Sequence, residues 1–434
     1  MDYLFEIIDF LNKFYWSYIG WGIVCVAGVY FTIISKGLQF RAIANFKKNI
    51  KDILLKDSNK SNLGIHPVKL YFASVGGMVG LGNIVGISTA LMIGGPGSIF
   101  WTVIASICGM LIKYSEIYLG VKYRITNKDG GFDGGPMYYL PKAFKNKYVA
   151  YFVAFLICLY GIEVYQFTVL VDRLQYSFEF NRVAIIIGLL GLVFYSSIGG
   201  IKRLANICTI IMPIFMFIYV FIALYIIINN ISLLPAFLSN VISSAFINQG
   251  PIGGFVGSSV LLATYHGMSK AVYSGDIGIG YDSIVQSETS IINPKKQATL
   301  AIYALFTDTL ICLLTNVMLG ITGAWYNLQH VSETRVISET IANYFPYSNL
   351  FVTLLLFFAG FTTLIAYIST GIKCAKYLNP RHGTKIYLMY AIFAFIVFSN
   401  YSSDKIMTIM GLLSGILVLI NVSGLIKLRK EIRF

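Results

Sequence analysis

Residues 74–86 read SVGGMVGLGNIVG and lie inside an apolar run, 68–93, that is long enough to cross a bilayer. Five glycines and one asparagine interrupt this run, although glycine in a helix interior costs roughly 1 kcal/mol relative to alanine. At membrane depth, non-helical backbone is tolerated only where it lines a cavity or is buried in protein. The stretch therefore predicts a spanning helix that unwinds halfway, beside a binding cavity. The alternative interpretation is that the glycines let neighbouring helices pack closely.

The composition indicates a polytopic membrane protein. Of the 434 residues, 57% are hydrophobic and 12% are charged, whereas about 25% of residues are charged in soluble domains. The six cysteines are dispersed and form no CxxC pair, so we expect neither a disulfide framework nor a zinc site. The enzyme motifs HExxH and GxSxG are absent from the sequence, and we expect neither enzyme activity nor an organic cofactor.

Eleven apolar segments are predicted to cross the membrane, which makes the fold class all-α. Residues 1–16 are predicted to form an amphipathic helix at the membrane interface. The predicted spans are 17–35, 68–94, 98–122, 147–171, 182–199, 206–229, 252–274, 298–323, 349–372, 384–400 and 405–426.

The distribution of Lys and Arg predicts the orientation. With the N-terminus outside and the C-terminus in the cytoplasm, 28 of the 33 Lys and Arg residues fall in cytoplasmic connections, as the positive-inside rule requires. The five on the other side are Lys13, Arg173, Arg182, Arg335 and Lys405. We interpret the net charge of +14 as a topology signal in the cytoplasmic (inner) membrane, and we expect no nucleic-acid partner.

A second interrupted segment, QGPIGGFVGSSVLLATYHGMSKAVYSGDIGIG at 249–280, lies five spans after the first. Each interrupted segment is followed by four ordinary spans, so two five-helix units of opposite topology are predicted. Such an inverted repeat with paired broken helices is typical of secondary transporters. The predicted divisions are 1–67 (interfacial helix, first span and basic connection), 68–229 (first repeat) and 230–434 (second repeat and tail). Freed N–H groups would bind a carboxylate, and freed carbonyls a cation.

Several motifs resemble the alanine/glycine:cation symporter family. They are GLGNIVGISTALMIGGPGSIFW at 80–101, KYSEIYLGVKYR at 113–124 and GGPMYYL at 134–140. The resemblance implies a leucine-transporter-type fold with one extra N-terminal span. It also implies sodium-coupled symport of a small neutral amino acid such as alanine or glycine, by alternating access. We expect a monomer whose partners are the amino acid, the coupling ion Na⁺ and the bilayer.

The resemblance also implies roles for residues around the first interruption. Asn83 would face the substrate, and Gly80 and Gly82 would lie in the unwound turn beneath it. Gln166 stands where the family has a glutamine in its substrate pocket.

Further substrate-binding positions are implied in the second repeat. Gly267 would lie in the turn of the second broken helix, and His266 occupies an aromatic position of the family. Tyr367 stands where the family has tryptophan. His266 is either a proton-sensitive residue of the pocket or a hydrogen-bonded structural histidine.

A sodium site is implied between the first broken helix and the ninth span. The hydroxyls of Thr362 and Thr363 would bind the ion together with backbone carbonyls near Gly76 and Gly77. The alternative is that both threonines donate to carbonyls of their own helix.

Glu163 is an ionisable residue inside an apolar span, three residues before Gln166 and on the same helix face. An intramembrane carboxylate is a functional candidate by default. It could bind the substrate's ammonium group, take up a proton in a proton-coupled or altered-specificity transporter, or lie near the outer interface. A channel is a disfavoured alternative, because its pore segments would repeat by subunit symmetry.

Five charged residues are predicted to have gating or structural roles. Lys113 and Glu116 are spaced as an i,i+3 salt bridge. Lys270 and Asp276 are expected near the inner mouth, where they could form a closing contact. Asp308 is expected in a gating or structural ion pair.

Overall fold

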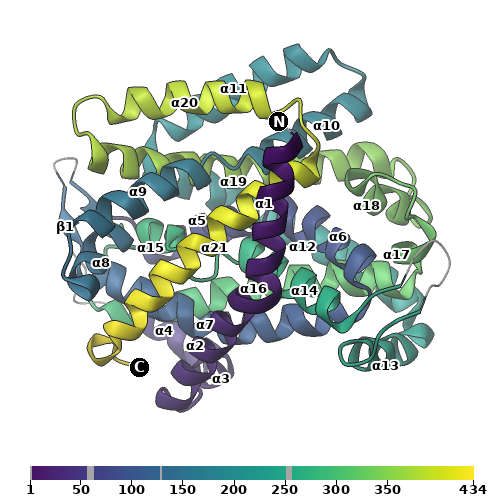
Figure 1. Cartoon of the computed structure of the whole chain (residues 1–434), viewed down its shortest axis with the longest axis horizontal. Coiled ribbons are helices and arrows are strands. Elements are labelled where there is room, and N and C mark those ends of the chain that lie inside the picture. Colours follow the sequence, from purple (N-terminus) through teal and green to yellow (C-terminus); the bar gives the residue numbers. More distant parts are fainter. Residues whose placement is uncertain (1, 56–62, 128–129, 251–256) are drawn as a thin grey trace.

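The computed structural model describes residues 2–55, 63–127, 130–250 and 257–434, which are almost entirely helical (Figure 1). Up to α12 the elements are α1 (Asp2–Phe14), the π-helix η1 (Tyr15–Gly20), α2 (Trp21–Ile34), α3 (Leu38–Ala44), α4 (Phe46–Leu55), α5 (Pro67–Met78), the 3₁₀ turn η2 (Leu81–Asn83), α6 (Val85–Gly94), α7 (Gly97–Lys122), β1 (Ile125–Thr126), β2 (Phe132–Asp133), α8 (Pro136–Phe144), α9 (Tyr148–Tyr160), α10 (Val164–Phe178), α11 (Arg182–Ser197) and α12 (Gly200–Asn229). They continue with η3 (Ile231–Leu233), α13 (Leu234–Ser244), α14 (Val260–Ser274), α15 (Tyr281–Gln286), α16 (Pro294–Ile321), α17 (Ala324–Asn327), α18 (Glu333–Ala342), α19 (Ser348–Leu378), α20 (Gly383–Phe398), α21 (Ser403–Lys427) and η4 (Arg429–Glu431). The two strands pair antiparallel.

Seven helical segments of the described chain are long and apolar enough to cross a membrane, and the bent pair Pro67–Met78 and Leu81–Gly94 makes an eighth. The predicted spans 182–199 and 384–400 appear as the shorter apolar helices Arg182–Ser197 and Gly383–Phe398. The predicted span 252–274 appears as α14, which begins at Val260, and residues 252–256 lie outside the described residues. The seven long segments are Phe5–Ile34, Gly97–Lys122, Tyr148–Phe178, Gly200–Asn229, Pro294–Ile321, Ser348–Leu378 and Ser403–Lys427.

The glycine-rich and polar segments form the centre of the molecule. Residues 73–92 and 271–291 are buried throughout, and both pass through the middle of the bundle in Figure 1. Helix α12, by contrast, exposes large apolar side chains such as Ile210, Phe217 and Ile228. Exposed apolar helices around a polar, buried centre are the arrangement expected of a protein solvated by lipid.

The first interruption lies where the sequence predicts it. Helix α5 ends at Met78, and α6 continues after a 58° bend. Gly80 is extended (φ −125°, ψ −152°) and precedes the 3₁₀ turn Leu81–Asn83. A Cβ at Gly80 would lie 2.4 Å from Oγ1 of Thr363 on α19, so only glycine lets the unwound backbone approach that helix.

The second interruption lies at residues 275–280, between α14 and α15, and not at Gly267. Asp276, Gly278 and Gly280 have φ of 49°, 72° and 96°, a left-handed conformation that glycine adopts readily and aspartate tolerates better than most residues. Gly267 lies inside α14, where a Cβ would come within 2.4 Å of the Ser98 carbonyl oxygen. The expected turn at Gly267 is therefore wrong, because this glycine serves close packing of α14 against α7.

A third interruption separates α9 from α10 and was not predicted from the sequence. Residues 161–163 leave the helix, and Glu163 has a left-handed conformation with φ 53° and ψ 50°. A non-glycine residue in this region is strained and persists only where its surroundings hold it in place. Gly161 allows the close approach, because a Cβ there would lie 3.3 Å from the Tyr367 carbonyl oxygen.

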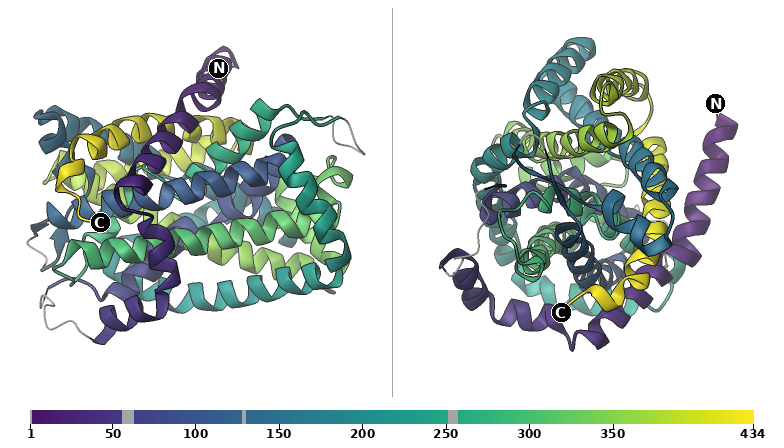
Figure 2. Two further views of the ribbon diagram at one scale, coloured as in Figure 1. Left: turned by 90° about the horizontal axis from the view of Figure 1, so that it is seen from below. Right: turned by 90° about the vertical axis from the view of Figure 1, so that its left-hand side faces the viewer.

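The N-terminal segment also differs from expectation. Instead of a separate interfacial helix over 1–16, α1 continues through the π-helix η1 into α2. Trp16 is fully buried, and its indole N–H donates to the Gly411 carbonyl of α21 at 3.0 Å. Figure 2 shows the N-terminal end of α1 projecting beyond the remaining helices. The burial of Trp16 fixes this segment as part of the helical bundle.

The close approach at Gly267 can be tested by stability. Gly267→Ala should destabilise the protein by about 1–3 kcal/mol, the usual cost of overpacking, because the added Cβ meets backbone of α7 at 2.4 Å. Gly188→Ala on α11, whose Cβ would meet nothing within 4 Å, is the matched control. The measurement is thermal unfolding of the purified proteins in detergent. Equal melting temperatures for the two variants would contradict the close helix contact.

Candidate functional site

The first interruption offers fewer free N–H groups than the sequence suggests. The Gly80 N–H donates to Oδ1 of Asn83 at 3.1 Å, and the Leu81 N–H donates to Oε1 of Gln166 at 2.9 Å. Both side chains are almost completely buried. Two amide oxygens thus occupy the positions at which a ligand carboxylate would accept, so Asn83 and Gln166 hold the unwound turn in a defined shape.

The amide nitrogen of Asn83 connects this turn to α16. It donates to Oδ1 of Asp308 at 2.5 Å and lies 3.2 Å from Sγ of Cys312. The Thr315 hydroxyl donates to the Asn83 carbonyl at 3.0 Å. No ion pair of Asp308 occurs among the described residues, so the expected ion pair is wrong and a hydrogen bond to a neutral amide takes its place.

On the opposite side, α19 presents a hydroxyl to the end of α5. Oγ1 of Thr363 lies 3.1 Å from the Gly76 carbonyl oxygen and also 3.1 Å from the Ala359 carbonyl. Thr362 points elsewhere, because its hydroxyl contacts Sδ of Met212 at 3.6 Å and carbonyls of its own helix. The oxygen atoms that could bind a hard cation here are therefore those of Thr363 and Gly76.

Gly77 and Gly82 allow side chains of neighbouring helices to approach the backbone of the first interrupted helix closely. A Cβ at Gly77 would lie 2.4 Å from the hydroxyl of Tyr281, and one at Gly82 would lie 3.3 Å from the ring of Tyr273. The first interrupted helix is therefore in direct contact with both halves of the second.

Glu163 lies at the centre of a group of tyrosines. Its side chain is 1% exposed, and Oε2 accepts a 2.6 Å hydrogen bond from the Tyr273 hydroxyl. The Tyr273 ring lies 6.3 Å from that of Tyr160 and 6.0 Å from that of Tyr165, and Tyr160 lies 5.6 Å from Tyr367. Glu163 is thus buried among protein side chains and is not exposed at the surface of the molecule.

Of this group only Tyr367 was identified from the sequence; Tyr160, Tyr165 and Tyr273 were not. The four tyrosines come from α9, α10, α14 and α19, and with 30 tyrosines in the chain no local pattern distinguishes these few. A buried carboxylate beside several tyrosine side chains is an environment suited to an ammonium group, since the carboxylate and aromatic rings both attract positive charge.

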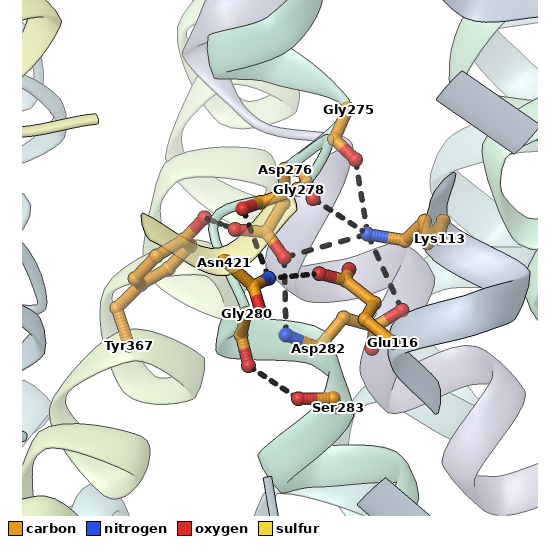
Figure 3. A network of polar contacts seen from close by, with 10 residues as sticks. All are labelled: Lys113, Glu116, Gly275, Asp276, Gly278, Gly280, Asp282, Ser283, Tyr367 and Asn421. Atoms are coloured by element: carbon orange, nitrogen blue, oxygen red, sulfur yellow. Dashed lines mark hydrogen bonds and ion pairs between the residues drawn. The ribbon is translucent and has the colours of Figure 1, made fainter. Parts of the chain in front are cut away.

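The second interruption is filled by side chains from its neighbours (Figure 3). Nζ of Lys113 donates to the carbonyls of Gly275 at 3.0 Å and Asp276 at 3.2 Å. The same nitrogen lies 3.4 Å from Oδ2 of Asp276 and 3.4 Å from Oδ2 of Asp282. Lys113 does not form the expected ion pair with Glu116 within the described residues, because the lysine side chain extends toward α14 and α15 instead.

Glu116 has a different partner. Its Oε2 accepts from Nδ2 of Asn421 at 2.8 Å, and that nitrogen also donates to the Gly278 carbonyl at 3.0 Å. The Tyr139 hydroxyl donates to Oδ1 of Asn421 at 2.7 Å. Tyr367 lies beside this network, because its hydroxyl is 3.4 Å from Oδ1 of Asp276.

Lys270 and Asp276 do not form the expected contact. Asp276 faces Lys113, whereas Lys270 interacts electrostatically with Glu333 of α18 and Asp404 of α21. Burial, together with the neighbouring Asp404, raises the pKa of Glu333 to about 7, and Lys270 opposes this shift. This cluster was not predicted from the sequence, because its members are separated by more than 60 residues in the chain.

His266 lies apart from the residues around the first interruption. It packs edge-on against Tyr265 with ring centroids 4.7 Å apart, and a Cβ at Gly94 would touch its side chain at 3.2 Å. The next residue, Gly267, contacts α7 through its carbonyl, which accepts from Thr102 Oγ1 at 3.3 Å. The structure thus brings together Asn83, Gln166, Thr363 and Asp308. His266, on α14, lies instead beside Gly94 at the C-terminal end of α6.

Comparisons with known proteins identify relatives along the whole chain. The sequence matches the sodium:alanine symporter family over residues 1–433. An uncharacterised transporter of Haemophilus influenzae is 33% identical over 369 residues, which cover 82% of this chain and 79% of the relative. The sodium/alanine symporter AgcS of Methanococcus maripaludis is 27% identical over 444 residues, which cover 99% of this chain and 95% of that protein.

Two solved transporter structures have a similar fold. A Na⁺-coupled sialic acid symporter has a TM-score of 0.52 and 12% identity, with 95% of this chain and 82% of that chain covered. The nucleobase-cation-symport-1 family transporter Mhp1 has a TM-score of 0.52 and 11% identity, with 84% of this chain and 80% of that chain covered. Together with the apolar helices, these likenesses indicate a multi-pass membrane protein with a transporter fold.

The cluster around Glu333 predicts a pH dependence of stability. A carboxyl group with a folded pKa of about 7 binds its proton more tightly than in the unfolded chain, where the pKa is about 4.3. The contribution of Glu333 to the free energy of unfolding is therefore full below about pH 4 and is lost as pH rises toward about 7, by a few kcal/mol at most.

Melting temperatures measured in detergent between acidic and neutral pH test this expectation. Glu333→Gln should flatten the decline toward neutral pH. Glu339→Gln, which removes a partly exposed carboxylate of the same helix, should keep the parental slope. A parental slope in Glu333→Gln would disprove the assignment.

Proposed function

Because this chain belongs to the sodium:alanine symporter family, we propose that it is a secondary transporter that couples uptake of a small neutral amino acid to sodium. The observation that carries the proposal is the contact between two buried, interrupted helices, with the Thr363 hydroxyl 3.1 Å from the Gly76 carbonyl at one of the interruptions. Unwound backbone buried at the centre of the bundle offers N–H donors to the carboxylate of a zwitterion and carbonyl acceptors to an ion.

The proposed topology has eleven spans, with the N-terminus outside and the C-terminus in the cytoplasm. The first repeat is α5 to α12 and the second is α14 to α21, each opening with an interrupted helix. The asymmetric distribution of Lys and Arg supports this orientation. Substrate and ion shift the populations of two states in which the central site faces opposite sides.

We propose that the substrate carboxylate binds at the turn formed by Gly80, Gly82 and Asn83. Asn83 and Gln166 supply amide oxygens to the N–H groups of that turn, and a carboxylate would compete for the same donors. Tyr367 and Glu163 lie beside the second and third interruptions, where the substrate's ammonium group has an acceptor in the Glu163 carboxylate.

The proposed sodium site uses oxygen ligands, which hard cations prefer. Thr363 and the Gly76 carbonyl are the nearest pair, and the carbonyl of Gly77 belongs to the same turn of α5. Thr362 is not retained in this proposal, because its hydroxyl is directed to Met212 and its own helix.

A second candidate function is proton-coupled uptake. Glu163 supports it, because a carboxyl group that is 1% exposed and hydrogen-bonded to Tyr273 could exchange a proton during the cycle. His266 no longer supports this alternative, since it lies outside the central group.

Uptake of radiolabelled alanine and glycine into proteoliposomes tests the proposal. Uptake should be driven by an inward sodium gradient at equal pH and should saturate with substrate. Uptake that ignores sodium but follows an imposed proton gradient would replace the first candidate with the second. Uptake that does not saturate and carries single-channel current would indicate a channel.

The two threonines provide a matched test of the ion site. Thr363→Val removes the hydroxyl that faces Gly76 and should raise the sodium concentration for half-maximal uptake by about tenfold, as loss of roughly 1.4 kcal/mol would. Thr362→Val removes a hydroxyl of the same helix that faces Met212 and should change this concentration little. Equal effects of the two substitutions would refute the assignment.

Glu163→Gln separates the roles of the central carboxyl group. The amide preserves a hydrogen-bond acceptor for Tyr273 but removes the charge. If Glu163 binds the substrate ammonium, substrate affinity should fall by about tenfold or more with the sodium dependence retained. If Glu163 carries a proton, gradient-driven uptake should be lost while substrate exchange across the membrane continues. Unchanged kinetics in both assays would exclude both roles.

A further inference from the structure

The second interruption already contains a cation, the ammonium group of Lys113. Figure 3 shows the Lys113 side chain directed from α7 into the gap between α14 and α15. Its nitrogen lies within 3.4 Å of four oxygens, two of them main-chain carbonyls of Gly275 and Asp276 and two of them carboxylate oxygens of Asp276 and Asp282. These contacts use all three donors of an ammonium group.

The chemistry of the gap explains why a cation is needed there. Helix α14 ends at Ser274, and the C-terminal end of a helix carries partial negative charge on unpaired carbonyls. The Asp276 carboxylate accepts from the Asp282 N–H at 3.0 Å, at the first turn of α15. Carbonyls and carboxylates therefore converge on one point.

Burial makes the cation obligatory. The side chains of Lys113, Asp276 and Asp282 are 0% exposed, and an unpaired buried charge costs several kcal/mol. Glu116, also 0% exposed, adds a further carboxylate to the same region. Without the ammonium, the gap would be an oxygen-lined site of the kind that binds a hard metal cation.

We propose that Lys113 is the resident cation of the second interrupted helix. It takes the place that a mobile ion would otherwise occupy, so sodium binds at the first interruption alone and one sodium ion accompanies each substrate. The inference rests on the proposed sodium-coupled function and adds its stoichiometry. It also makes Lys113 a positioning residue, because one ammonium on α7 holds the ends of both α14 and α15.

The stoichiometry is measurable on the unaltered protein. Proteoliposomes are loaded with sodium and alanine at fixed gradients, and the membrane potential is varied until net alanine flux is zero. A ratio of one sodium per alanine is expected. A ratio of two would overturn the inference, because a second mobile ion would then need a second site.

Substitution of Lys113 tests the site itself. Lys113→Gln removes the tethered charge and leaves the oxygens available to sodium. Replacing choline chloride by sodium chloride should therefore stabilise Lys113→Gln about twice as much as the parent, because stabilisation by independent bound ligands adds. Lys122→Gln, at the exposed end of the same helix and paired with Glu431 at 2.7 Å, should respond as the parent does. Equal sodium-induced shifts in Lys113→Gln and the parent would overturn the inference.

The two measurements separate failure of this inference from failure of the proposed function. If uptake by the parent ignores sodium, sodium coupling fails, yet the comparison of Lys113→Gln with the parent still reports whether an ion enters the vacated gap. If Lys113→Gln does not fold, the zero-flux ratio of the parent decides alone.

Discussion

The constraint on which the structure depends is the need to satisfy backbone polar groups far from water. Three helices unwind at the centre of the bundle, and each freed group must find a partner inside the protein. At the first interruption the partners are Asn83, Gln166 and Thr363. At the second they are Lys113 and Asn421. The neighbouring helices α7, α10, α19 and α21 are therefore required for the central segments to exist in this form.

The two interruptions are satisfied by different chemistry. Around the first, the partners are neutral amides and hydroxyls, which a zwitterion and a sodium ion could displace or join at modest cost. Around the second, a buried ammonium and carboxylates hold the chain, and separating them would leave charges unpaired. This difference favours a cycle in which the first interruption exchanges its ligands and the second keeps its shape.

The sequence predicted the first interruption and the residues around it well. The resemblance to the family assigned Asn83, Gln166 and Thr363 to one site. The structure brings these three residues together, although they come from three helical segments. Reasoning from local spacing was less successful. The i,i+3 spacing of Lys113 and Glu116 suggested a pair on one helix face, but both side chains have stronger partners on other helices. Gly267 was placed in a turn, although its real role is the contact with α7.

The amino-acid sequence alone is enough to establish that this chain is a bundle of membrane-spanning helices with an unwound segment at 79–84, because apolar length and clustered glycines are properties of the local chain. The family could also be recognised at this stage, since each of the motifs within 80–140 is an uninterrupted stretch of the chain. The folded structure was needed to show which cation contacts the carbonyls at 275–276, why Thr363 and not Thr362 faces α5, and which tyrosines lie near Glu163. These contacts depend on how helices distant in sequence are rotated and packed against one another, and residue spacing along a single helix does not predict that rotation.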